Sequence, residues 1–277
     1  MLRVSRWRVP GWRWLAAGAL ATGASAADKS GYSLANPTPV AEMREMSTDR
    51  PDATESPFTV DAGHAQLEMD FASWTQDKAA GVRTTTVGAG AFNVRLGLRN
   101  DVEAGIFVAP YVRSAEQPGG TVAGVGDMTL RTKVNLWGNY GGKTAGGLIF
   151  DATLPTARRG LGSAWASGAV IFPLAVTLTE GWDLGAMTAV DYHHRDSGAG
   201  STATWINTAT LGRELTKSVS CYVELTSGAG EGPHAATFDA GVAWQCAADT
   251  QLDLGVNLGL SRAADDVVVF TGLSRRF

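Results

Sequence analysis

The most regular feature of the chain is an alternation of apolar and polar residues at a period of two. In GDMTLRTKVNLWG (126–138), Leu130 and Val134 share one parity, whereas Arg131 and Lys133 share the other. Successive side chains of a β-strand point to opposite faces, so the pattern predicts a strand with one apolar and one charged face. The open question is which of the two faces meets water.

The same alternation recurs along the rest of the chain. It predicts twelve strands, near 63–74, 84–98, 102–113, 126–138, 145–155, 166–178, 181–194, 202–214, 217–228, 235–247, 250–261 and 266–277. Most are long enough for a tilted strand to cross a bilayer, which takes about 9 to 11 residues, whereas strands of soluble domains average about 5 to 6. Strand length therefore favours a membrane protein.

The predicted connections alternate between long and short. The long ones include 75–83, 114–125 and 156–165, and the short ones include 99–101, 179–180 and 248–249. Outer-membrane barrels have short periplasmic turns and longer outer loops, and an even number of strands leaves both termini in the periplasm. Twelve strands with a long first connection fit that arrangement.

The strand patterns alone leave two fold classes open, because a secreted β-sandwich and a membrane barrel both produce such apolar rows. No helix is predicted that would cover a sheet edge, and closure removes edges that lipid cannot solvate. The polar rows, such as those of 91–99 and 251–261, alternate Gly and Asn with charges that suit a narrow wet lumen. The prediction is therefore all-β: a single antiparallel transmembrane β-barrel of about 12 strands, closed by pairing of the first and last strands.

The amino-terminal region predicts export. Residues 1–26 carry four arginines, then an apolar run, then the small-residue site Ala24-Ser25-Ala26, the order of a secretory signal peptide. Removing those arginines from the 23 basic residues leaves 19 against 27 acidic residues, a net charge of −8, which argues against nucleic-acid binding. Residues 27–62 carry prolines and no strong period. They predict an irregular periplasmic leader, a plug of the pore in one interpretation, ahead of a barrel over 63–277.

Cysteines and the carboxyl terminus carry further predictions. Cys221 and Cys246 either form a periplasmic disulfide or remain separate thiols, because sequence does not fix the cross-strand register. Phe277 ends an apolar-alternating last strand, the pattern associated with recognition by the outer-membrane barrel-assembly machinery. The spacings of His and Cys match no metal site, and no cofactor is predicted.

Five stretches of the chain resemble a known family: TDRPDATESPFTVDAGHAQLE (48–68), GVGDMTLRTKVNL (124–136), LIFDATLPT (148–156), YVEL (222–225) and QLDLGVNLGLSRAADDVVVFTGLSRRF (251–277). They resemble the outer-membrane transporters named after the meta pathway of phenol degradation, and the resemblance spans 48–277. One departure is Ala157, where a glycine is more usual. The resemblance implies a barrel in the outer membrane of a Gram-negative bacterium, with a role in uptake or efflux of small, often aromatic, compounds.

The inward-facing polar residues are the candidate lumen lining: Glu68, Asp70, Arg95, Asp127, Arg131, Lys133, Asp151, Glu224, Asp253 and Asn257. Charges on a pore wall set its selectivity, or they pair into a network that fills the interior. A second candidate group lies in the leader: Asp49, Arg50, Asp52 and Glu55. This motif either folds into the mouth, with Arg50 pairing to lumen carboxylates, or forms a turn-rich segment that its prolines keep out of helix.

The predicted function is passive passage of small, aromatic or hydrophobic molecules through the lumen, without enzymatic activity. Its partners are the lipid bilayer, the assembly machinery and the solute; the oligomeric state is not predicted. A structural barrel with a filled lumen is one alternative. Another is a barrel enzyme acting on lipid acyl chains, which needs a nucleophile and an oriented base. For that enzyme His194 has outward parity, and Asp196, Ser197 and Ser201 follow it.

Overall fold

The structure is a computed structural model that describes residues 29–195 and 200–277, so the predicted signal peptide and the loop residues Asp196 and Ser197 lie outside the described part. The described residues form a short 3-10 helix (Val40–Glu42) and fifteen strands: β1 (Ala65–Ala79), β2 (Val82–Ala89), β3 (Phe92–Arg99), β4 (Val102–Val108), β5 (Tyr111–Gln117), β6 (Thr121–Gly124), β7 (Met128–Trp137), β8 (Thr144–Leu154), β9 (Ser167–Thr179), β10 (Trp182–His194), β11 (Ser201–Glu214), β12 (Val219–Ala229), β13 (Ala235–Ala247), β14 (Thr250–Gly259) and β15 (Val267–Arg276). No helix of this part is long and apolar enough to cross a membrane.

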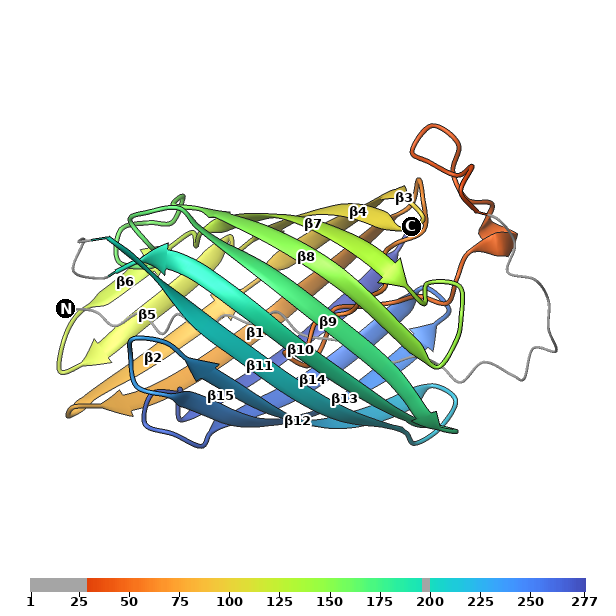
Figure 1. Ribbon diagram of the computed structural model, residues 1–277. Helices are drawn as coiled ribbons and strands as arrows, with labels where there is room; N and C mark the ends of the chain where they lie inside the picture. The colour runs from red at the N-terminus through yellow and green to blue at the C-terminus, as the bar shows by residue number, and fades with distance from the viewer. Residues whose placement is uncertain (1–28, 196–199) are drawn as a thin grey trace.

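Twelve of the strands form one closed antiparallel ring (Figure 1). Each ring strand pairs with its neighbours, and β15 pairs with β1 from Gln66↔Arg276 to Gln76↔Val267. The pairing of the first and last strands removes the two free edges that an open sheet would present. The prediction of a single twelve-stranded barrel, closed in this way, is confirmed.

The three other strands, β2, β5 and β6, continue β3, β4 and β7 beyond short breaks. β2 and β3 pair with successive parts of β1, and β5 pairs with both β2 and β6. The predicted long loops 75–83 and 114–125 are therefore wrong. The chain turns instead through Ala80 and Gly81, whose φ angles are 50° and 81°, as in the two-residue turns that match the twist of a hairpin.

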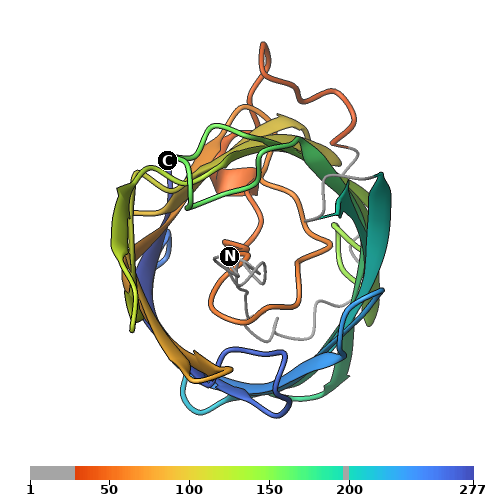
Figure 2. The ribbon, with the colours of Figure 1, turned by 90° about the vertical axis from the view of Figure 1, so that its left-hand side faces the viewer.

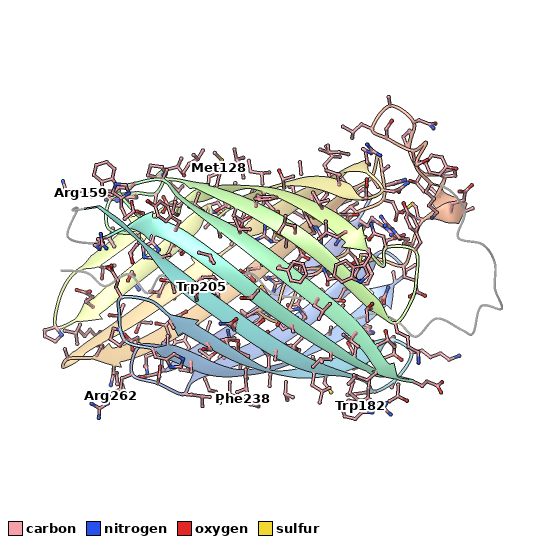
Figure 3. The ribbon with its side chains drawn as sticks, viewed as in Figure 1. Met128, Arg159, Trp182, Trp205, Phe238 and Arg262 are labelled. Carbon is pink, nitrogen blue, oxygen red and sulfur yellow. The ribbon has the colours of Figure 1, made fainter. Side chains whose placement is uncertain are left out.

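The apolar rows lie on the outside of the barrel and the polar rows on the inside. On β12, Leu225 is 56% exposed, whereas its neighbour Glu224 is 2% exposed. Trp182 and Trp205 lie on the outer surface as well (Figure 3). A β-sandwich would bury its apolar row, so this inverted arrangement answers the question of the two faces: the apolar row is the one suited to lipid.

The leader passes from outside one end of the ring into its interior. The 3-10 helix lies beyond one end of the barrel (Figure 1), and the chain then runs within the ring before it enters β1 (Figure 2). Residues 46–62, which we name the leader loop, are buried throughout except for the half-buried Phe58. The interior of the barrel is therefore shared between wall side chains and this loop.

Candidate functional site

The leader loop is held in the lumen by side chains rather than by strand pairing. The described strand pairings include no residue of 46–62. Among the described residues the leader makes one isolated β-bridge to the wall, Ser33↔Arg99, which lies outside the loop. The interior of an eight-stranded barrel is just filled by its own side chains, and a twelve-stranded one is wider. The loop occupies this extra space while the wall is complete without it.

Asp49 of the leader loop is bound by cations from the wall. Its two carboxylate oxygens lie 2.6 and 2.7 Å from Nζ of Lys133, and Arg95 Nη1 lies 3.3 Å away. Burial raises the pKa of Asp49, but Arg95, Lys133 and Arg131 outweigh that effect and lower it from 3.8 to about 2. Asp49 is therefore a buried ionised carboxylate whose charge is compensated on the wall.

Arg95 is the centre of this cluster and is fully buried. Its guanidinium donates to Glu103 at 2.8 and 2.9 Å, to Glu68 at 2.7 Å, and to the carbonyl oxygens of Ser47 and Phe58 in the leader loop at 3.2 and 3.1 Å. A planar guanidinium suits this task because its donors diverge in fixed directions. Arg95 thereby joins three strands to both limbs of the loop.

Arg131 on β7 extends the cluster along the wall. It donates to Asp151 on β8 at 2.7 and 2.8 Å, and its Nη1 lies 2.7 Å from Oε1 of Glu55 in the leader loop. We name the inward face of β1, β3, β4, β7 and β8 the basic wall, because it carries Arg95, Arg131 and Lys133, with Glu68, Glu103 and Asp151 between them. These three cations match these three carboxylates, and Asp70 on β1 pairs instead with Arg50 of the loop, so the carboxylates of Asp49 and Glu55 are additional.

Arg50 of the leader loop makes the reverse contact, from loop cation to wall carboxylate. It donates to Asp253 on β14 at 2.7 and 3.0 Å and pairs with Asp70 on β1. Its guanidinium also lies 5.7 Å from the centre of the Phe270 ring. Arg50 therefore fastens the loop across the β14–β15–β1 closure of the barrel.

The opposite side of the leader loop faces carboxylates. Glu224 on β12 accepts from the backbone N–H of Ala53 at 2.7 Å and from the hydroxyl of Thr54, while Asp239 pairs in register with it on β13. Neither acid has a Lys or Arg within salt-bridge distance in the described chain. We name the inward face of β11, β12 and β13 the acidic wall.

Asp52 is buried against this acidic wall. Burial first, and then the nearby Glu224, raise the pKa of Asp52 well above its usual range. Among the described residues no three of the His, Cys, Asp and Glu side chains converge as metal ligands, so these carboxyl groups are not arranged as a cation site. Three residues apart in the loop, Asp49 and Asp52 thus occupy opposite electrostatic environments.

The lumen beyond the loop is lined by hydroxyl groups and apolar side chains. Cross-strand hydroxyl pairs join Thr129 to Thr153 at 2.8 Å and Thr226 to Thr237 at 2.7 Å. Two apolar clusters are buried on the inner side of the wall. Ile149, Ile171, Met187 and Ala189 form the first, which lies at the leader loop, where Met187 Sδ accepts from the backbone N–H of Glu55 at 3.5 Å; Ala109, Val112 and Leu161 form the second. This part of the interior suits uncharged solutes better than ions.

Most of the predicted lumen-lining residues lie on the inward face around the leader loop: Glu68, Asp70, Arg95, Arg131, Lys133, Asp151, Glu224 and Asp253. Asp127 lies apart, where it holds residues 155–166, and the half-buried Asn257 pairs in register with Asp239. Sequence reasoning missed Glu103 and Asp239, although each has the inward parity of its strand. Their role in permeation stays a prediction.

The other singled-out residues lie at the end of the barrel where the leader enters. Cys221 and Cys246 are both free, because the register sets Cys221 opposite Val242 and leaves Cys246 four positions further along β13. The disulfide alternative is therefore not formed. The backbone N–H of Phe277 donates to the carbonyl of Ala65 at 2.8 Å, next to the β15–β1 closure. Its recognition by the assembly machinery stays a prediction.

One contact required by the enzyme alternative is present. Ser201 Oγ lies 3.3 Å from Nδ1 of His194, whose ring stacks on Trp165 at 4.7 Å. Hydrolysis also needs a group that orients the base. The nearby carboxylate of Asp191 lies 3.5 Å from His193, on the other face of the strand, and so does not serve His194 in that way.

These features define an outer-membrane β-barrel whose lumen holds a segment of its own chain. Residues 48–277 match the sequence family described as "Putative MetA-pathway of phenol degradation", and the chain belongs to that family. The resemblance seen in the sequence is confirmed. No curated protein sequence matches the chain.

Solved structures support the fold. The β domain of the Bordetella autotransporter BrkA is similar with a TM-score of 0.50 and 12% identity, covering 76% of this chain and 98% of its own. The NanC porin (TM-score 0.49, 9% identity, 76% and 98% coverage) and the CymD monoaromatic hydrocarbon channel (0.45, 10%, 77% and 87%) are also similar. At 12% identity, the likeness to the BrkA β domain shows a shared barrel fold.

Proposed function

We propose that the chain is an outer-membrane channel for small uncharged solutes, with the leader loop as a displaceable plug. The observation that carries the proposal is that the closed wall is complete without the loop, which ion pairs and hydrogen bonds hold inside it. A barrel that served only as a structural element would need no separable segment in its interior. The shorter turns lie at the end of the barrel where the loop enters, and so do the start of β1 and the end of β15. This arrangement supports that end as the periplasmic one.

The solute class follows from the outer part of the lumen. The hydroxyl pairs Thr129–Thr153 and Thr226–Thr237 offer hydrogen bonds, and the half-buried Phe107 and Val122, packed on the second apolar cluster, offer surface for an apolar body. Small phenolic or other aromatic molecules combine these two properties. The family's description, which refers to phenol degradation, supports this class of solute. No residue of the proposed path performs covalent chemistry.

Conductance in a planar bilayer tests the proposal. Arg50→Ala removes the contacts to both Asp70 and Asp253 and is expected to lengthen or multiply openings relative to the natural chain. Arg195→Ala is the matched control, because Arg195 forms a comparable pair with Glu231 on the exposed outer side. Equal conductance of Arg50→Ala and Arg195→Ala would exclude the plug, and silence of every variant would exclude the channel.

The lipid-hydrolase alternative is separated by a second measurement on the same proteins. Ser201→Ala removes the hydroxyl that contacts His194 and leaves the leader loop untouched. Conductance is expected to be unchanged, and phospholipid is expected to remain intact with both the natural chain and this variant. Release of fatty acid by the natural chain, lost in Ser201→Ala, would instead establish the enzyme.

A further inference from the structure

Four adjacent strands are interrupted along one side of the barrel. β1 bulges at Phe71, β2 and β3 are separated by Gly90 and Ala91, and β4 and β5 by Ala109 and Pro110. β6 and β7 are separated by 125–127. Two of the few hydrogen bonds across this line are Asp70 N–H to Ala91 O at 2.7 Å and Gly126 N–H to Ala109 O at 2.8 Å. We name this line of interruptions the seam.

The seam is widest between the strand formed by β4 and β5 and the strand formed by β6 and β7. The last pairs on either side are Phe107↔Thr129 and Val112↔Gly124, so four residues of each strand lie between them outside the ladder. Pro110 in this gap has no N–H to donate. β6 has β5 as its one paired neighbour in the described sheet, so its other edge faces residues 155–166 rather than a strand.

The seam lies within the membrane. β3 and β4 contribute 8 and 7 residues between the periplasmic turn and the seam, whereas a tilted strand needs about 9 to 11 to cross the hydrocarbon layer. Irregular backbone at that depth is tolerated only where protein covers it or where it lines a cavity, since lipid cannot satisfy its hydrogen bonds. An interruption repeated in four neighbouring strands therefore has a cost that a regular barrel would avoid.

The lumen side of the seam is apolar. Ala109, Val112 and Leu161 are buried together, with Phe107 and Val122 packed against them. The lipid side is apolar as well, because Tyr111 and Val125 are 43% and 48% exposed. Apolar side chains therefore line both the lumen face and the lipid face of the broken strands.

Residues 155–166, which we name the latch, cover the seam from inside, and their contacts concentrate at the break between β6 and β7. Asp127 accepts from the backbone N–H groups of Ala157 and Ser163, both at 2.9 Å. Arg158 N–H donates to the carbonyl of Val125 at 3.0 Å. The Leu161 side chain completes the apolar cluster. A few polar contacts at one point, together with one apolar side chain, thus hold the latch against the seam.

We propose that the seam is a side portal through which small apolar solutes pass between the lumen and the outer leaflet, and that the latch is its cover. The proposal rests on the proposed channel function and adds a second exit. Solutes that partition into lipid leave sideways, whereas hydrophilic solutes follow the axis. Asp127, predicted from sequence as a lumen charge, is in this arrangement the anchor of the cover.

A reversible disulfide tests the portal in one protein. A Cβ built on Gly124 would lie 2.8 Å from Cβ of Arg158, whereas a disulfide spans about 3.5 to 4.5 Å between Cβ atoms. A shift of the latch by about 1 Å therefore lets Gly124→Cys and Arg158→Cys bond the latch to β6. Cys221→Ser and Cys246→Ser remove the natural thiols. Entry of a fluorescent apolar naphthylamine into intact cells that carry the barrel reports the side path, and arabinose-driven swelling of proteoliposomes reports the axial path.

Oxidation is expected to reduce entry of the naphthylamine several-fold and reduction to restore it, with arabinose permeation the same in both states. Asp127→Ala is expected to increase entry of the naphthylamine without the bond. Unchanged entry on oxidation, or an equal fall for both solutes, would overturn the portal. Absence of arabinose permeation in every state would instead overturn the underlying channel function, so the two failures are distinguishable.

Discussion

On the basic wall the leader loop meets three buried cations, whereas on the acidic wall it meets carboxylates and hydroxyls and, among the described residues, no cation. Asp49 lies 2.6 Å from Lys133, and three residues later Asp52 is buried near Glu224. A buried charge is tolerated when an opposite charge and hydrogen bonds compensate it, and otherwise the group favours its neutral form. The same residue type therefore holds the loop on one side and opposes its docking on the other.

We expect the two walls to hold the leader loop with different strengths. Removing one partner of a buried ion pair leaves an uncompensated charge, which makes the basic wall the firm attachment of the loop. On the acidic wall the loop is held by the backbone N–H of Ala53 and the hydroxyl of Thr54, contacts of ordinary hydrogen-bond strength. We expect the loop to release first from the acidic wall.

The largest effect is expected from Arg95→Met. The substitution keeps an apolar stem but leaves the buried Glu68 without its cation and Glu103 with Lys133 alone, at 3.8 Å, which costs about 3 to 5 kcal/mol. Unfolding by urea in detergent measures this loss of stability, with the fraction of folded barrel read from the migration of unheated protein on a denaturing gel. Arg195→Met, at the exposed pair with Glu231, is expected to leave the midpoint unchanged. Similar midpoints for the two variants would contradict a basic wall that stabilises the barrel.

Asp49→Asn is expected to release the plug while the wall stays folded. The amide cannot compensate Lys133, so docking loses on the order of 3 kcal/mol, about a hundredfold in its equilibrium constant. Planar-bilayer recordings should show longer openings than those of the natural chain, with an unchanged urea midpoint. Openings like those of the natural chain would show that Asp49 does not hold the loop.

Asp52→Asn is expected to have the opposite sign. The neutral amide removes a carboxyl group from a site that already faces Glu224, and docking strengthens by about 1 kcal/mol. Shorter or rarer openings are expected in the same recordings. Because the substitution is identical to that at Asp49, volume and hydrogen-bonding capacity are matched between the two variants. Openings that lengthen in both would remove the distinction between the walls.

The alternation along the strands was enough to predict the barrel wall. Each strand has one face toward lipid and one toward the lumen, and it must be long enough to cross the membrane. The same alternation gave inward parity to Arg95, Arg131 and Lys133. It could not give the partners of these residues, since Asp49, the partner of Lys133, lies in a turn-rich segment without periodicity. Contacts of an aperiodic segment depend on packing that the strand pattern does not record.

The breaks in β2–β3, β4–β5 and β6–β7 were also beyond the pattern. Alternation continues on both sides of Gly90 and Pro110, so the sequence predicted continuous strands there, whereas it predicted a loop over 114–125 and missed β6. The latch was predicted as an ordinary long loop. Its anchorage on Asp127 depends on two backbone N–H donors, which any residue type can supply, and so Asp127 was indistinguishable from a lumen charge.

The smallest expected effect is a dependence of gating on pH. In the docked loop the pKa of Asp52 is raised, so its contribution to docking is full below its ordinary value of 3.8 and is lost as pH rises through the raised value. The pKa of Asp49 is lowered to about 2, so its contribution is present above 3.8 and is lost as pH falls toward that value.

Acidification from neutral pH to about 4 should therefore shorten openings, because Asp52 binds a proton while Asp49 keeps its charge. Burial raises the pKa of Glu55 in the leader loop to about 7, which acts in the same direction, so Asp52→Asn should flatten this dependence rather than abolish it. Recordings of the natural chain and the variant over this pH range measure the difference. Identical pH profiles would show that Asp52 docks without a titrating carboxyl group, and openings that lengthen on acidification would place the weaker attachment on the basic wall.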